Sequence, residues 1–123
     1  MGCRVLLVDD HAAFRAAARQ VLESAGCVVV AEAADGGAAV RLAHQLHPDA
    51  VLLDIQLPDI DGFAVAAQIA AEVEPRPIVV LISSRSASSY RRRLADSDVA
   101  GFLGKSDLSG PELLAFLAPA VGA

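Results

Sequence analysis

The sequence is poor in several features that point to particular classes of protein. Aromatic residues make up only 4% of its 123 residues, and tryptophan is absent. No apolar run approaches the roughly 20 residues that a membrane-spanning helix needs. The start of the chain, Met1–Arg4, lacks the basic region, apolar segment and cleavage site of a signal peptide. We therefore expect a cytoplasmic protein that does not contact a membrane.

Cysteine and positive charge are also scarce. The two cysteines, Cys3 and Cys27, match no metal-binding spacing. We expect two buried thiols in a reducing compartment, with a contact between them left open, and not a disulfide. The net charge is −5, the opposite of the basic footprint of a nucleic-acid binder. This chain alone is therefore not expected to bind nucleic acid.

Apolar residues are abundant, at 54% of the chain, and they follow a regular pattern. Five apolar runs alternate with five amphipathic stretches, which predicts a parallel sheet with helices on both faces. We predict one domain over residues 1–123, with a flavodoxin-like, doubly wound (βα)5 α/β fold and strand order 2-1-3-4-5. The predicted strands are Arg4–Val8, Cys27–Glu32, Ala50–Leu53, Pro77–Ile82 and Val99–Leu103, and the predicted helices are His11–Ala25, Gly36–His47, Gly62–Glu72, Ser86–Asp96 and Leu108–Ala120.

Turn and capping residues support these boundaries. Gly26 is a plausible stop for the first helix, and Asp35 can cap the second. Asp107 or Ser109 can cap the fifth. The most polar stretch is 83–89, rich in serine. Small polar residues pack poorly, so we predict a mobile loop there and a loose start to the fourth helix.

The most informative stretch is Val51–Asp54, in which three bulky apolar residues run directly into a carboxylate. An apolar run without alternation is typical of a strand buried on both faces. A carboxylate at the end of such a strand lies at the rim of the sheet, where open α/β folds place their active sites. We therefore interpret Asp54 as a nucleophile that accepts a phosphoryl group.

Other polar residues follow the remaining apolar runs. The first run ends in Asp9 and Asp10, the fourth in Ser83, and the fifth is followed by Lys105, the only lysine beside nine arginines. In the order 2-1-3-4-5 the first and third strands are neighbours, so Asp9, Asp10 and Asp54 should converge. Ser83 and Lys105 should reach these three carboxylates from the other side.

The chemistry of this predicted cluster fits phosphoryl transfer. Three clustered carboxylates repel one another unless a cation compensates, and a set of oxygen ligands suits Mg²⁺ or Mn²⁺. A lysine ammonium is a compact charge that can approach one carboxylate or phosphate oxygen. A serine hydroxyl adds a hydrogen-bond donor. Nucleophile, metal, cation and donor are the parts that phosphoryl transfer to a carboxylate requires.

At this point the sequence closely resembles a family, the receiver domain of two-component response regulators. The resemblance covers essentially the whole chain, and it is strongest for the branch that carries a C-terminal helix-turn-helix DNA-binding domain. Its specific segments are Leu7–His11, Leu53–Gly62, Ile82–Ser84 and Gly101–Lys105. It implies a phosphorylation switch in signal transduction, not a turnover enzyme. No output domain is expected within these 123 residues, so the domain would either control transcription in a full-length regulator or act alone.

The resemblance also implies roles for individual residues. Asp54 would take a phosphoryl group from a phosphohistidine of a cognate sensor histidine kinase. Asp10, Asp54 and the backbone carbonyl of Gln56 would bind Mg²⁺, and Asp9 would hold the metal or a metal-bound water. Lys105 would pair with Asp54 and then with the phosphoryl oxygens. The switch residues would be Ser83, which would hydrogen-bond the phosphoryl group, and Phe102, an aromatic side chain that would turn inward as Ser83 moves.

Some positions depart from the family pattern or carry less information. The family often has proline after the lysine, where this chain has Ser106. Gln56 and Arg85 lie where the family tunes dephosphorylation, so the lifetime of the phosphorylated state stays open. His11 could line the mouth of the site or be a first-turn residue, and Tyr90 is expected to be a packing residue. The basic run at 91–93 is either a solvated face or a surface for a partner or a homodimer.

Three other functions compete with this interpretation. A phosphatase of the haloacid dehalogenase type needs a second aspartate two residues after the nucleophile, where Gln56 stands. A flavodoxin-like electron carrier needs a hydroxyl-rich phosphate loop and aromatics around the flavin, which this chain lacks. A degenerate receiver would act as a phosphorylation-independent interaction or dimerisation module. All five expected site residues are present, which favours the phosphoacceptor.

Overall fold

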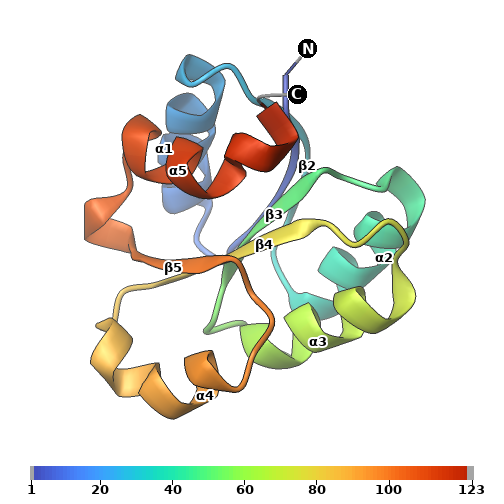
Figure 1. The fold of residues 1–123 in the computed structure, drawn as a ribbon, viewed down its shortest axis with the longest axis vertical. Coiled ribbons are helices and arrows are strands. Elements are labelled where there is room, and N and C mark those ends of the chain that lie inside the picture. Colours follow the sequence, from blue (N-terminus) through green and yellow to red (C-terminus); the bar gives the residue numbers. More distant parts are fainter. Residues whose placement is uncertain (1, 122–123) are drawn as a thin grey trace.

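The computed structural model describes residues 2–121 as a five-stranded parallel sheet (Figure 1). The strand order is β2-β1-β3-β4-β5, which confirms the predicted flavodoxin-like topology. The first and third strands are therefore neighbours at the centre of the sheet, as predicted. The strands are β1 (Arg4–Val8), β2 (Val28–Ala33), β3 (Ala50–Asp54), β4 (Ile78–Ser83) and β5 (Gly101–Gly104).

Five helices alternate with the strands. They are α1 (Ala12–Ser24), α2 (Gly36–Leu46), α3 (Gly62–Glu72), α4 (Arg91–Ala95) and α5 (Gly110–Val121), with 3-10 turns at Ala87–Tyr90 and Lys105–Asp107. The prediction of one helix over Ser86–Asp96 is wrong: the segment begins as a 3-10 turn, and only five residues are α-helical. Serine side chains compete for backbone hydrogen bonds just before it, since the Ser83 hydroxyl accepts from Arg85 N at 3.0 Å.

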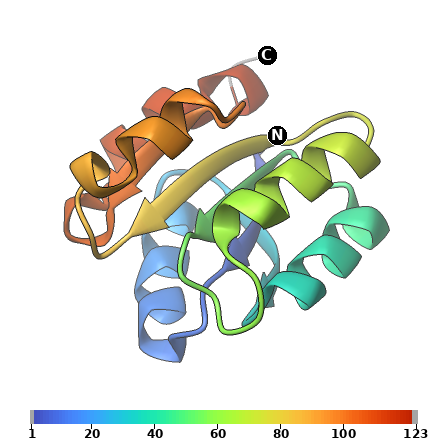
Figure 2. The ribbon, with the colours of Figure 1, turned by 90° about the horizontal axis from the view of Figure 1, so that it is seen from below.

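The helices cover both faces of the sheet. Along β1, Leu6 and Val8 pack with α2 and α3, whereas Val5 and Leu7 pack with α1 and α5. Figure 1 and Figure 2 show these two pairs of helices on opposite sides of the strands. The period-2 alternation of side chains places successive residues of β1 in opposite halves of the core, so an apolar run without alternation is what a strand covered on both faces requires.

The helix ends largely follow the predicted capping residues. Gly26 has a φ of +91°, the left-handed backbone that commonly ends a helix. The Asp35 side chain accepts a hydrogen bond from Ala38 N at 2.7 Å and caps α2. At the start of α5 the Ser109 hydroxyl accepts from Glu112 N at 3.3 Å, so Ser109, of the two expected candidates, makes the capping bond.

The two cysteines lie at the far end of the sheet from the strand ends described below. Cys3 and Cys27 are both buried and free, and they belong to the same cluster of core residues. The expectation of two buried thiols is confirmed. None of the helices within residues 2–121 has the length and apolar character needed to span a membrane.

Candidate functional site

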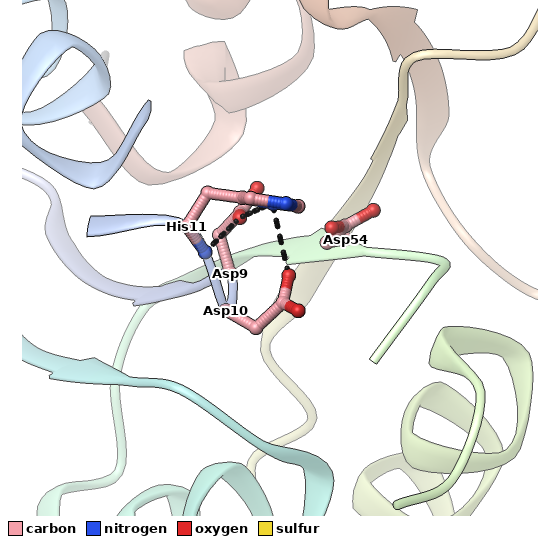
Figure 3. A group of neighbouring side chains, drawn as sticks. All are labelled: Asp9, Asp10, His11 and Asp54. Carbon is pink, nitrogen blue, oxygen red and sulfur yellow. Dashed lines mark hydrogen bonds and ion pairs between the residues drawn. The ribbon is translucent and has the colours of Figure 1, made fainter. Parts of the chain in front are cut away.

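Three carboxylates meet at the carboxyl ends of β1 and β3. Asp9 and Asp10 follow the last residue of β1, and Asp54 is the last residue of β3. Because Val8 pairs with Leu53 in the sheet, these side chains reach the same point on its edge. Asp9 is fully buried and Asp54 is 2% exposed, while 33% of the Asp10 side chain is exposed. The cluster is therefore open to solvent on the Asp10 side (Figure 3).

Lys105 places its ammonium between two of these carboxylates. Its Nζ lies 2.6 Å from Asp9 Oδ2 and 3.2 Å from Asp54 Oδ2. The same Nζ lies 4.6 Å from the centre of the Phe14 ring of α1, a cation–π distance. Burial disfavours the charged ammonium, but the Asp9 and Asp54 carboxylates outweigh it and raise the pKa of Lys105. The lysine therefore stays charged and offsets part of the negative charge of the cluster.

The Asp54 carboxyl has an unfavourable environment for a buried charge. Burial raises its pKa, and the nearby Asp9 carboxylate adds to this effect. The Gln56 backbone N–H, which donates to Asp54 Oδ1 at 3.1 Å, and the Lys105 ammonium act in the opposite direction. A carboxylate under such opposing influences is typical of a functional site, where a further cation would stabilise its ionised form.

The loop after Asp54 is anchored to the start of α2. The two carboxylate oxygens of Asp59 accept hydrogen bonds from Gly36 N at 2.8 Å and Gly37 N at 2.9 Å. These two bonds hold the pKa of Asp59 below its usual range. At the other end of the loop, a Cβ on Gly62 would come within 2.5 Å of the Asp54 carbonyl oxygen, so only glycine fits there. The backbone around Gln56 is thus held at both ends.

Arg15 of α1 fixes the backbone on the other side of the cluster. Its guanidinium donates to the Asp9 carbonyl oxygen at 2.6 Å and to Glu32 Oε1 at 2.9 Å. Glu32 also accepts from Arg19 at 2.7 Å. These contacts tie α1 and β2 to the turn that carries Asp9 and Asp10. The sequence analysis missed them, because the polar residues involved are far apart along the chain.

The serine at the end of β4 contacts a tyrosine. Ser83 is fully buried, and its Oγ accepts a hydrogen bond from Arg85 N at 3.0 Å and lies 3.3 Å from the Tyr90 hydroxyl. The Tyr90 ring packs between Phe63 and Phe102, with ring centres 5.9 Å and 6.2 Å away. Tyr90 is buried, whereas Phe102 is only partly so. Ser83 and Phe102 are therefore connected through Tyr90.

The structure brings most of the predicted site residues together. Asp9, Asp10, Asp54 and Lys105 form one cluster, and the register of β4 with β5 sets Ser83 opposite Gly104, next to the lysine. His11, which the sequence left open, joins this cluster. Phe102 lies further out, in contact with Tyr90. Three participants were missed: Tyr90, which was expected only to pack, and the anchoring residues Arg15 and Asp59.

The comparison with family models identifies the class of protein. Residues 5–117 match the model named response regulator receiver domain. The chain therefore belongs to this family, with an acidic pocket of the phosphoacceptor type at its strand ends. The resemblance inferred from the sequence is confirmed, and the phosphatase and electron-carrier alternatives are wrong.

Curated relatives fall into several groups. A protein of Pseudomonas aeruginosa is 34% identical over 97% of this chain and 57% of its own length. The transcriptional regulatory protein LiaR of Bacillus subtilis is 41% identical over 65% of this chain and 38% of its length. A protein-glutamate methylesterase/protein-glutamine glutaminase of Anaeromyxobacter dehalogenans is 43% identical over 75% of this chain and 27% of its own length. The chain thus spans about half the length, or less, of the curated relatives that it matches.

Solved structures agree with the family. A two-component response regulator of the LuxR family from Aurantimonas sp. has a TM-score of 0.85 at 30% identity, covering 98% of this chain and 89% of that chain. A second similar structure is the complex of CheX and CheY with BeF3 and Mg from Borrelia burgdorferi. One of its chains has a TM-score of 0.81 at 26% identity, covering 95% of this chain and 87% of that chain. This chain is similar both to a response regulator of the LuxR family and to a chain of the CheX–CheY complex.

Proposed function

We propose that Asp54 accepts a phosphoryl group from a phosphohistidine of a cognate sensor histidine kinase. The observation that supports this most directly is the convergence of Asp9, Asp10, Asp54 and Lys105 at one edge of the sheet. Two acids can hold a metal, the third is the nucleophile, and the lysine supplies a fixed positive charge. The domain acts as a switch, and it catalyses only its own phosphorylation and dephosphorylation.

In the proposed step a carboxylate oxygen of Asp54 attacks the phosphorus of the phosphohistidine. An O–P bond forms, the P–N bond breaks, and its electron pair returns to the imidazole nitrogen of the kinase. Hydrolysis follows when water attacks the same phosphorus and releases inorganic phosphate and the free carboxylate. Lys105, now between Asp9 and Asp54, pairs with the phosphoryl oxygens. The anchored loop at Gln56 keeps the carboxylate in position for attack.

The carboxylate cluster fits a divalent metal such as Mg²⁺ or Mn²⁺. Its ligand atoms lie within 4.8 Å of one another. The buried Asp9 Oδ2 pairs with the Lys105 ammonium at 2.6 Å, which offsets one of the three negative charges and leaves the others for a bound cation. Asp10, Asp54 and the carbonyl of Gln56 would hold the ion, with Asp9 binding it directly or through water. A bound Mg²⁺ would neutralise the negative charge on the phosphoryl oxygens.

Ser83 transmits the change to the surface around α4, β5 and α5. A phosphoryl group on Asp54 offers strong acceptor oxygens next to Ser83, which would turn from Tyr90 toward them. Tyr90 and Phe102 would then rearrange together, because their rings are in contact. In the full-length regulator this surface would control an output, and the relatives named as transcriptional regulators favour transcription. We place the protein in the cytoplasm, where sensor kinases present their phosphohistidine.

Intact-mass measurement after incubation with acetyl phosphate and Mg²⁺ tests this proposal. We expect a gain of one phosphoryl group that disappears with EDTA and in Asp54→Asn. Asp98→Asn, whose side chain is 82% exposed and remote from the site, is the matched control and should be phosphorylated normally. If no donor produces an adduct and beryllofluoride does not bind, the proposal is wrong and the protein is a phosphorylation-independent receiver.

A further inference from the structure

The geometry points to His11 as a nitrogen ligand that sets the metal preference of the site. We infer that its imidazole joins the carboxylates around a divalent ion and favours Fe²⁺, Co²⁺, Ni²⁺ or Zn²⁺ relative to Mg²⁺. This inference rests on the proposed metal site at Asp9, Asp10 and Asp54. It goes further by assigning a selectivity role to a side chain that the phosphoacceptor chemistry does not use.

The His11 side chain folds over the acidic pair although 68% of it is exposed. Its Nδ1 lies 3.0 Å from Asp10 Oδ1 and 3.2 Å from Asp9 Oδ1. Figure 3 shows the ring beside the Asp9 carboxylate and above the Asp10 carboxylate, with its far end toward Asp54. The His11 backbone N–H also donates to Asp9 Oδ1 at 2.8 Å. Backbone and side chain are therefore both directed into the cluster.

These separations match the coordination shell of a divalent ion. An octahedral ion with ligands at about 2.1 Å has neighbouring ligand atoms about 3 Å apart and opposite ones about 4.2 Å apart. The two distances from His11 Nδ1 to the carboxylate oxygens correspond to neighbouring positions. One ligand atom each from Asp9, Asp10, His11 and Asp54 lies within 4.8 Å of the others. Small side-chain movements would thus bring one nitrogen and three oxygens to a single ion.

The donor type decides which ion gains from His11. Mg²⁺ is a hard ion that prefers oxygen ligands and keeps several waters. Imidazole suits Fe, Ni, Cu and Zn, and affinities for nitrogen-containing sites rise from Mn²⁺ to Ni²⁺. An imidazole ligand adds affinity for Ni²⁺ but little for Mg²⁺. The competing explanation is that His11 only hydrogen-bonds the two carboxylates, in which case all divalent ions should be affected alike.

Two measurements on wild type, His11→Ala and the matched control His44→Ala separate these explanations. His44 is an exposed histidine of α2 that pairs with Glu72, remote from the site. The first measurement is calorimetric titration with Ni²⁺ and with Mg²⁺. We expect His11→Ala to weaken Ni²⁺ binding by roughly tenfold or more and Mg²⁺ binding by less than about threefold. His44→Ala should change neither.

The second measurement is pulsed electron paramagnetic resonance of the Mn²⁺-loaded protein, which detects ¹⁴N coupling when an imidazole is a ligand. We expect this coupling in wild type and in His44→Ala, and its loss in His11→Ala. Binding of Mn²⁺ without ¹⁴N coupling, or an equal loss of Ni²⁺ and Mg²⁺ affinity in His11→Ala, overturns the role of His11 and leaves the phosphoacceptor proposal standing. Failure of wild type to bind any of these ions overturns the metal site as well.

Discussion

The Ser83 Oγ and the Tyr90 hydroxyl lie 3.3 Å apart in the buried space between β4 and the turn that precedes α4. This contact joins the residue that would hydrogen-bond a phosphoryl group to an aromatic ring that touches both Phe63 and Phe102. A hydroxyl partner for the serine stabilises the arrangement without phosphate. We therefore propose that Tyr90 is part of the switch, because the contacts from Ser83 to Phe102 pass through it.

Replacing Tyr90 with phenylalanine should favour the switched arrangement. The ring keeps its packing, but Ser83 loses a hydrogen-bond partner worth about 0.5–1.5 kcal/mol. Beryllofluoride, which occupies the position of the phosphoryl group, should then bind roughly twofold to tenfold more tightly in the presence of Mg²⁺. Calorimetric titration measures this change. Weaker binding by Tyr90→Phe would mean that the hydroxyl supports the switched state instead.

Replacing Ser83 with alanine should separate phosphorylation from its consequence. The nucleophile, the acids and Lys105 are unchanged, so acetyl phosphate should still modify Asp54. The alanine cannot donate to the phosphoryl group, so the movement of the segment around α4 should be reduced. Amide chemical shifts of residues 84–102, recorded with and without beryllofluoride, report that movement. Shift changes of wild-type size in Ser83→Ala would rule out this coupling.

The strand ends that carry the site were predictable because they depend on local sequence. A short unbroken apolar run is typical of a strand buried on both faces, and the residue after such a strand lies at the rim of the sheet. This argument located Asp9, Asp10 and Asp54, and the alternation of strands and helices then fixed which strands are neighbours. The Asp35 cap was predictable for the same reason, since the capping bond joins residues three positions apart.

The contacts that were missed join residues distant in sequence. Asp59 lies in the loop after β3 and caps a helix that begins 23 positions earlier. Lys105 lies nearer to Asp9 than to Asp54, although the expected pairing was with Asp54. Tyr90 looked like a packing residue because nothing in the local pattern shows that its hydroxyl meets Ser83. Such contacts follow from tertiary packing, which neither periodicity nor capping rules describe.

Asp54→Asn should stabilise the metal-free protein. Burial and the Asp9 carboxylate raise the pKa of Asp54, so folding works against its ionised form near pH 7. A neutral amide of the same size removes this cost, and we expect a gain of roughly 1–2 kcal/mol. Urea unfolding in EDTA measures the difference, with Asp98→Asn as the exposed control. A loss of stability would show that the pairing of Asp54 with Lys105 outweighs its burial.

The buried thiols should react slowly in the folded protein. Burial raises the pKa of Cys3 to about 12, and the pKa of Cys27 is also raised by burial. Because only the thiolate attacks, both thiols should stay unmodified by a disulfide reagent at pH 8 and react at once in urea. An exposed cysteine introduced as Ser88→Cys should react at the ordinary rate in the folded protein. Fast labelling of Cys3 without denaturant would contradict the raised pKa.

Asp59→Asn should destabilise the protein in a pH-dependent way. The carboxylate accepts from both Gly36 and Gly37, and its folded pKa is lowered by these bonds. Because the pKa is lower in the folded state, the ionised carboxylate stabilises the protein fully at pH values above its ordinary pKa of about 3.9. This stabilisation is lost as the pH falls through the lower pKa of the folded state. An asparagine offers one oxygen and no charge at the start of α2, so it keeps at most one of the two bonds.

The urea midpoint of Asp59→Asn should therefore lie below that of wild type near pH 7, and the difference should shrink toward about pH 2, where the wild-type carboxyl is protonated. Asp98→Asn, which alters an exposed carboxylate of similar size, should show no such trend. Because Asp59 anchors the loop that carries Gln56, Asp59→Asn should also be phosphorylated more slowly by acetyl phosphate. A constant stability difference at all pH values would show that the anchor does not depend on charge.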